Sequence, residues 1–188
     1  HEFHHAIHLG SYGSWDSDRY FYEITSTWME DVVYPNVNDY YQYLSNDPRR
    51  SSQFSYPDVR FTQSDGSIEY SRSVWGKFLE KRFTPDLMRQ VWENIRLVST
   101  LPAMNQALIG FGSSFREAFL EFAYWNSSTG PNADTLRFYS EGIKYPYIRG
   151  RSVVEYMPPR RSFSDSLQAV GSVYHPILVD GDPMLTII

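Results

Sequence analysis

Apolar side chains recur at helical spacing along most of this chain, and that pattern is the strongest constraint on its fold. Between residues 20 and 33, Phe21, Ile24, Trp28 and Val32 fall on one stripe, as the buried face of a helix requires. Aromatic residues make up 17% of the sequence and charged residues only 21%, the reverse of a disordered composition. With 188 residues the chain can bury a core. We therefore expect a folded, mainly α-helical protein.

Helical stripes and the residues that interrupt them define the expected elements. One start is marked twice, because Thr84 can cap a helix whose first position is Pro85. A long loop is expected over residues 45–67, where Pro48, Pro57 and the Asp65-Gly66 pair break any regular pattern. The pattern predicts helices over residues 1–9, 20–33, 38–44, 71–82, 84–99, 103–109 and 113–126.

The pattern changes after Gly130-Pro131. Short runs at residues 152–156 and 172–179 alternate in the manner of strands. We expect a helical domain over residues 1–150, followed by a β-rich segment over residues 151–188 that begins a further domain. The last six residues, 183–188, form an apolar run with no turn after it, so we expect the chain to be a fragment of a longer protein.

Charge and cysteine content exclude several classes of function. The formal net charge is −5, which gives no basic surface to attract nucleic acid. The sequence has no cysteine, so any bound metal must be held by nitrogen and oxygen atoms. No apolar run approaches the roughly 20 residues needed to cross a bilayer, and we expect no membrane span.

The first five residues form a metal-binding motif. His1-Glu2-Phe3-His4-His5 fits the pattern H-E-x-x-H, in which two histidines four positions apart lie on one helical face and bind one zinc ion. Glu2 lies beside the metal and can take a proton from water that zinc has made acidic. A remnant of a purification tag could also produce a histidine-rich start, but Ala6, Ile7 and Leu9 continue a helical apolar face.

A third ligand is available on the next predicted helix. Glu23 lies 18 positions after His5, which is enough for a loop and a reversal of direction. His1, His5 and Glu23 would then form a His₂Glu zinc site with one position open. Glu30 lies two turns after Glu23 on the same face and could orient a ligand imidazole.

Together these segments resemble the gluzincin metallopeptidases, the thermolysin-like clan. The resemblance is closest to a group of secreted bacterial metalloproteases in which a Trp-Met-Glu-Asp segment, here residues 28–31, follows the third ligand. It covers about residues 1–150. It implies the C-terminal helical part of a zincin-like domain, with Zn²⁺ held by His1, His5 and Glu23 and with Glu2 as general base. It also implies a peptide or protein substrate and an extracellular or cell-envelope location.

The sequence departs from the thermolysin pattern around the ligand glutamate. That pattern has Asn before the glutamate and Asp four positions after it, where this chain has Tyr22 and Thr27. The clan also uses a His or Tyr to stabilise the oxyanion, and the possible donors here are Tyr139, Tyr145, Tyr147 and His175. In such folds a β-lobe precedes the active-site helix, so the missing N-terminal lobe or other chains of a larger assembly are possible partners.

Other readings of the same residues remain open. His4 and His8 also lie four positions apart and form a rival pair, although no carboxylate lies between them as Glu2 does. The chain could be a non-catalytic surface or assembly protein that keeps a zincin scaffold as a binding module, or a zinc hydrolase of non-peptide substrates. A purely structural site would close the fourth position with a protein ligand such as His4, His8 or Asp31, whereas an enzyme would leave it open.

Overall fold

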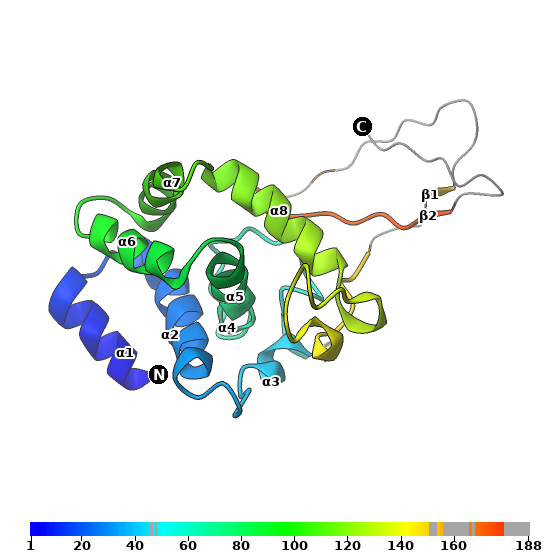
Figure 1. Cartoon of the computed structure of the whole chain (residues 1–188), viewed down its shortest axis with the longest axis horizontal. Coiled ribbons are helices and arrows are strands. Elements are labelled where there is room, and N and C mark those ends of the chain that lie inside the picture. The colour runs from blue at the N-terminus through cyan, green and yellow to red at the C-terminus, as the bar shows by residue number, and fades with distance from the viewer. Residues whose placement is uncertain (46, 48, 151–153, 156–165, 167, 179–188) are drawn as a thin grey trace.

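The computed structural model describes residues 1–45, 47, 49–150, 154–155, 166 and 168–178. Over these residues the chain is mainly helical, as the apolar stripes predict (Figure 1). Short irregular helices occur at η1 (His8–Tyr12), η2 (Asp16–Asp18), η3 (Gly130–Asn132) and η4 (Gly142–Lys144). The α-helices are α1 (Glu2–Ile7), α2 (Arg19–Val33), α3 (Tyr41–Leu44), α4 (Ile68–Ser71), α5 (Ser73–Arg82), α6 (Pro85–Ile95), α7 (Thr100–Gly110) and α8 (Phe115–Ser127).

Capping residues set several of the helix ends. The Thr84 hydroxyl accepts a hydrogen bond from the backbone N–H of Asp86, with Pro85 at the first position, as predicted for α6. The predicted C-terminus of this helix, at Ser99, is wrong. Ser99 has extended backbone angles and is the N-cap of α7, so α6 ends at Ile95. Helix α7 begins before the predicted Ala103 because a proline at position 102 is tolerated in a first turn.

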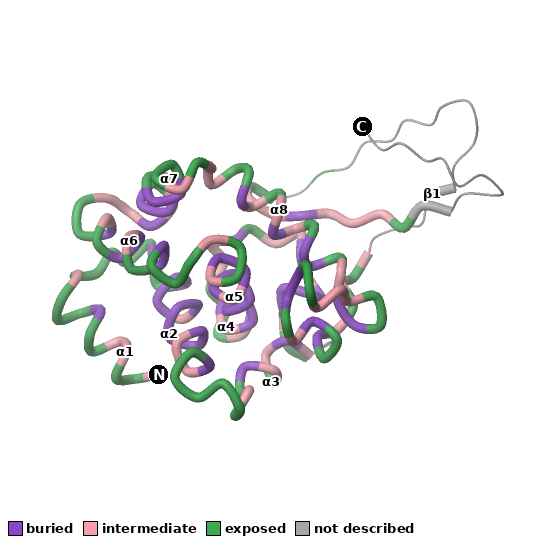
Figure 2. The backbone as a smooth tube through the Cα atoms, viewed as in Figure 1, coloured by how far each residue is buried: buried purple, intermediate pink, exposed green. Residues whose placement is uncertain are grey.

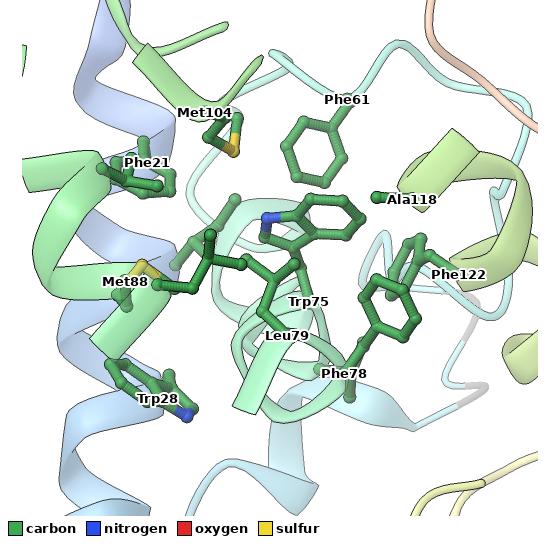
Figure 3. Packing of buried hydrophobic residues seen from close by; sticks show 14 of the residues in the cluster. Phe21, Trp28, Phe61, Trp75, Phe78, Leu79, Met88, Met104, Ala118 and Phe122 are labelled. Atoms are coloured by element: carbon green, nitrogen blue, oxygen red, sulfur yellow. The ribbon is translucent and has the colours of Figure 1, made fainter. Parts of the chain in front are cut away.

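The core is built around Trp75 on α5. Its indole is fully buried and packs against Phe61, Phe78 and Phe122 at ring distances of 5.1 to 5.4 Å (Figure 3). These rings come from α5, α8 and the loop that precedes α4, so one side chain joins three parts of the chain. Edge-to-face and tilted pairs of this kind add stability beyond the area they bury.

Helix α5 approaches α2 closely at a glycine. A Cβ atom added to Gly76 would overlap the Trp28 side chain of α2, so only glycine fits there. The Trp28 Nε1–H donates a hydrogen bond of 3.1 Å to Glu80, one turn further along α5. The close approach therefore gives the buried indole both a packing surface and a hydrogen-bond acceptor.

The predicted long loop is ordered by two side chains from the helices that follow it. The buried Arg72 guanidinium donates to the side chain of Gln53 and to the carbonyls of Val59, Phe61 and Gln63. The buried Glu69 carboxylate accepts hydrogen bonds from the Ser64 hydroxyl and the backbone N–H groups of residues 65, 66 and 67. These two side chains thus supply hydrogen-bond partners to backbone N–H and C=O groups of the loop, a role that neighbouring strands play in a sheet.

Helix α1 lies at the edge of the molecule, beside α2 and next to α6 (Figure 1). None of its residues is buried, whereas long stretches of α2 and α5 are buried (Figure 2). The π-helical turn η1 follows directly, and His8, its first residue, is 2% exposed and stacks on Trp92 of α6 at 3.6 Å. Helix α1 is therefore attached mainly along one face.

Past residue 150 the structure describes few residues. Strands β1 (Val154–Glu155) and β2 (Ile177–Leu178) pair in parallel. Residues 168–174 lie along the helical part. The backbone N–H of Phe61 donates a hydrogen bond to the carbonyl of Val170, and the backbone N–H of Ser172 donates one to the carbonyl of Pro57. Most of the β-rich segment predicted for residues 151–188 lies outside the described residues, so that expectation and the division at residue 150 stay predictions. Among the described residues, no helix is long and apolar enough to span a membrane.

Candidate metal centre

Helices α1 and α2 bring two imidazoles and a carboxylate together. The Nε2 atoms of His1 and His5 lie 3.0 and 3.4 Å from Oε2 of Glu23. The three ligand atoms all lie within 4.8 Å of one another, and no other group of three histidine or acidic side chains in the described part of the chain converges in this way. Each side chain retains 21 to 24% exposure, so the cluster is accessible from solvent.

Helical spacing explains this convergence. His1 and His5 are one turn apart at the start of α1, and their rings meet edge to face at 4.7 Å. On α2, Glu23, Ser26 and Glu30 are spaced by three and four residues and so share the face that meets α1. The two helices therefore present matching polar faces.

Glu30 contacts His1 at the ring nitrogen that does not face Glu23. Its Oε1 lies 2.5 Å from Nδ1 of His1. A carboxylate accepts hydrogen bonds, so Nδ1 carries the proton and a neutral His1 turns the lone pair of Nε2 toward Glu23. Carboxylates commonly orient metal-binding histidines in this way. The role predicted for Glu30 stays a prediction, and this contact is the geometry it would need.

The donor set fits a zinc ion. In a neutral His1 with the proton on Nδ1, the lone pair of Nε2 would face Oε2 of Glu23 at 3.0 Å, a contact that either a second ring proton or a bound cation satisfies. Ligands of a tetrahedral zinc lie about 3.4 Å apart when each bond is about 2.1 Å. Two nitrogens and one oxygen from protein leave one position open, which is the arrangement of catalytic zinc sites.

His4 and His8, the rival pair, lie behind the cluster. Their Nε2 atoms are 3.2 Å apart, and Nδ1 of His4 lies 3.0 Å from the Ser26 hydroxyl. Burial, followed by the charges of neighbouring histidines, lowers the pKa of His4 to about 4 and that of His8 to about 3. Both rings are therefore neutral near pH 7 and are engaged with each other and with Ser26.

Asp31, the remaining residue considered as a closing ligand, is engaged elsewhere. It is 3% exposed and forms an ion pair with Lys77 of α5. Lys77 also lies 3.6 Å from Glu141, which accepts a hydrogen bond from the Tyr40 hydroxyl. Asp31 thus belongs to a polar network between α2 and α5, and its oxygens are not part of the His1–His5–Glu23 cluster.

Glu2, the predicted general base, is an exposed residue in the first turn of α1. No hydrogen bond or ion pair engages its carboxylate within the described part of the chain. Glu2 follows His1 directly in the sequence. Its catalytic role stays a prediction.

The predicted oxyanion donors lie elsewhere in the fold. The Tyr139 hydroxyl donates to Asn126, and the Tyr145 hydroxyl shares a hydrogen bond with Tyr40, so both are tied to the buried interior. Tyr147 is half exposed beside Gly130, and His175 belongs to the segment before β2. Residues 130–150 and 168–178 lie across the helices from α1 (Figure 1). The structure thus does not bring these four residues to the cluster.

Tyr70 of α4 is a neighbour of the cluster that sequence reasoning missed. Its ring lies 5.9 Å from that of His1 and stacks on Tyr43 at 4.9 Å. Burial, and then the charge of Glu23 and a hydrogen bond to it, raise the pKa of the Tyr70 hydroxyl to about 12. A neutral phenol is thus held next to the Glu23 carboxylate. No spacing signal marks Tyr70, because a long loop separates it from the ligands.

Ser26 was also missed, although the sequence offered a signal for it. It lies three residues after Glu23 and therefore on the same helical face. It is fully buried, and its hydroxyl lies 3.3 Å from Nδ1 of His5. The Ser26 hydroxyl thus contacts Nδ1 of His5, as the Glu30 carboxylate contacts Nδ1 of His1.

An apolar groove borders the cluster. It has a volume of about 650 Å³ and is walled by α1, α2 and α6. His1 and Glu30 are among its lining residues, so the groove and the cluster are contiguous. Its apolar lining includes Phe3, Ile7, Met29, Val33 and Met88.

Comparisons with known proteins found no match for the chain among family models, curated proteins or solved structures.

Proposed function

We propose that this chain is a zinc-dependent peptidase of the gluzincin type. The observation that carries the proposal is the convergence of His1, His5 and Glu23 from two helices, with Glu30 behind His1. In this assignment the three residues hold Zn²⁺, and Glu2 accepts a proton from the attacking water and returns it to the leaving amine. Zinc, when bound, supplies the Lewis acidity that polarises the scissile carbonyl and acidifies water.

Two observations favour an open, catalytic site over a closed, structural one. The side chains that could close the fourth position are engaged elsewhere, His4 and His8 with each other and Asp31 with Lys77. The ligands themselves are about one-fifth exposed, which leaves a route for substrate. Structural zinc sites, by contrast, are closed by four protein ligands.

The groove beside the cluster supports a peptide with apolar side chains as the substrate. Its lining is mostly apolar, with the polar residues His1 and Glu30 where it meets the cluster. Ligand sites commonly combine an apolar wall with a few polar groups that fix orientation. An extracellular or cell-envelope location is part of the proposal and rests on the family resemblance alone.

The test is zinc content and casein hydrolysis, measured on the same purified samples. Wild type is expected to bind one zinc per chain. Glu23→Gln and His5→Ala should lose it, because each removes one of three ligands. Glu2→Gln should keep zinc and lose hydrolysis by at least about 100-fold, the usual contribution of a general base. Glu93→Gln, at an exposed i,i+3 ion pair on α6, is the matched control and should change neither property.

Each outcome separates the proposed function from its rival. Zinc retained by both Glu23→Gln and His5→Ala would contradict the ligand assignment. Zinc bound by wild type without any hydrolysis would favour the binding module, in which the groove serves to hold a partner. Hydrolysis that persists in Glu2→Gln would remove Glu2 from the mechanism and leave the metal assignment intact.

A further inference from the structure

A continuous chain of polar contacts runs from the metal cluster into the protein. Nε2 of His5 faces Glu23, and Nδ1 of the same ring lies 3.3 Å from the Ser26 hydroxyl. The Ser26 hydroxyl is also 3.0 Å from Nδ1 of His4, whose Nε2 is 3.2 Å from Nε2 of His8. Four side chains from α1, η1 and α2 thus form one path.

The inner end of this path is shielded from water. Ser26 is fully buried, and His8 is 2% exposed beneath Trp92. The Ser26 hydroxyl and Nε2 of His8 have their hydrogen-bond partners within the path, whereas Nδ1 of His8 is buried and has no partner among the described residues. Each member therefore constrains whether its neighbour donates or accepts.

Counting protons leaves two consistent arrangements. A neutral imidazole has one N–H group and one acceptor nitrogen, and a hydroxyl has one proton to donate. In the first, His5 Nδ1–H donates to Ser26, Ser26 donates to Nδ1 of His4, and His4 Nε2–H donates to His8. This arrangement leaves a lone pair on Nε2 of His5.

In the second arrangement every hydrogen bond is reversed. His8 Nε2–H donates to His4, His4 Nδ1–H donates to Ser26, and Ser26 donates to Nδ1 of His5. Nε2 of His5 then carries the proton and faces Oε2 of Glu23 at 3.4 Å. The number of protons is the same in both, and only the first arrangement lets His5 bind a metal ion.

We propose that Ser26, His4 and His8 form a positioning relay that couples the tautomer of His5 to that of His4, with the second arrangement present in the metal-free protein and the first selected when zinc binds Nε2 of His5. The inference rests on the proposed zinc site. Ser26 is the central member, because its hydroxyl lies within hydrogen-bond distance of both His4 and His5. Zinc binding at His5 should therefore reverse the tautomer of His4, which does not touch the metal.

The experiment measures zinc affinity by competition with a chelator, and ring tautomers by nitrogen NMR of the histidines. Ser26→Ala should weaken zinc binding by about 10- to 100-fold, as loss of a group that orients a metal ligand does. Thr27→Val is the matched control, since its neighbouring buried hydroxyl has no hydrogen-bond partner among the described residues, and it should bind zinc within about twofold of wild type. Ser26→Thr, which keeps the hydroxyl, should recover most of the affinity.

The tautomer measurement needs no variant. In wild type, adding zinc should move the proton of His4 from Nδ1 to Nε2, a change that a merely structural serine would not cause. An unchanged His4 tautomer, together with unchanged affinity in Ser26→Ala, would overturn the relay while zinc binding by wild type keeps the metal site. Wild type that binds no zinc would overturn the metal site and the relay with it.

Discussion

Helices α1 and α5 both pack on α2, but by different means. The residues of α5 that meet the core, among them Trp75, Phe78 and Leu79, are at most 1% exposed and pack by shape. Helix α1 buries none of its residues and meets α2 through imidazoles, carboxylates and the Ser26 hydroxyl. The placement of α5 is thus fixed by packing, whereas that of α1 depends on where protons and cations reside.

The largest loss of stability is expected from a substitution that removes the packing of α5 against the core. Trp75→Ala should lower the free energy of unfolding by about 3–5 kcal/mol, because it removes a fully buried indole at the meeting point of three segments. Phe3→Ala on α1 is the control. Its ring is 80% exposed, so the change should stay within about 0.5 kcal/mol. Urea unfolding followed by circular dichroism measures both, and similar losses would refute the contrast.

A smaller effect should follow from adding one methyl group between α5 and α2. Gly76→Ala places a Cβ against Trp28 and should destabilise the protein by about 1–3 kcal/mol through overpacking. Gly110→Ala is the matched control, since the nearest atom to an added Cβ there is 3.9 Å away. A Gly110 variant that melts as low as the Gly76 variant would show that packing against Trp28 is not the cause.

The smallest expected loss of stability is caused by low pH and concerns His8, the residue that follows α1. Burial lowers the pKa of His8 to about 3, below the ordinary histidine value of 6.5. The unfolded chain therefore binds more protons than the folded one, so the stability that neutral His8 confers is complete above pH 6.5 and is lost as pH falls toward 3. We expect a loss of about 1 kcal/mol between pH 7 and pH 5, after allowing for solvent screening.

Urea unfolding of the metal-free protein at the two pH values tests this expectation. His8→Phe keeps an aromatic ring on Trp92 but cannot bind a proton, so it should lose less stability between pH 7 and pH 5 than wild type does. The same loss in both proteins would place the acid sensitivity outside His8.

Local signals predicted much of the fold. The stripe of Phe21, Ile24 and Trp28 became the buried face of α2, and the Thr84-Pro85 pair marked the start of α6. The end of α6 was misplaced because Ser99 reads as a continuation of one helix and is the cap of the next. Periodicity shows which residues are buried, but two adjacent helices with compatible stripes look like one.

The residues of the candidate site also divide into those that helical spacing predicts and those that it does not. The positions of His1, His5, Glu23 and Glu30 follow from helical spacing on two neighbouring segments, which the sequence displays directly. Helical spacing could not identify Tyr70, because this residue reaches the cluster after a loop whose path depends on Arg72 and Glu69. The four residues predicted as oxyanion donors were chosen by type alone, without any spacing to place them, and the fold carries them elsewhere.

The ordering of that loop has a consequence for how quickly the chain can assemble. The groups that Arg72 binds lie between 9 and 19 residues from it along the sequence. Closing so short a span costs little chain entropy, so the irregular part of the fold can form early. Contacts such as Trp15 with Ile95 or Tyr40 with Tyr145 span 80 and 105 residues and must wait for distant helices to meet. In this protein the loop can serve as an early scaffold onto which the regular helices are gathered.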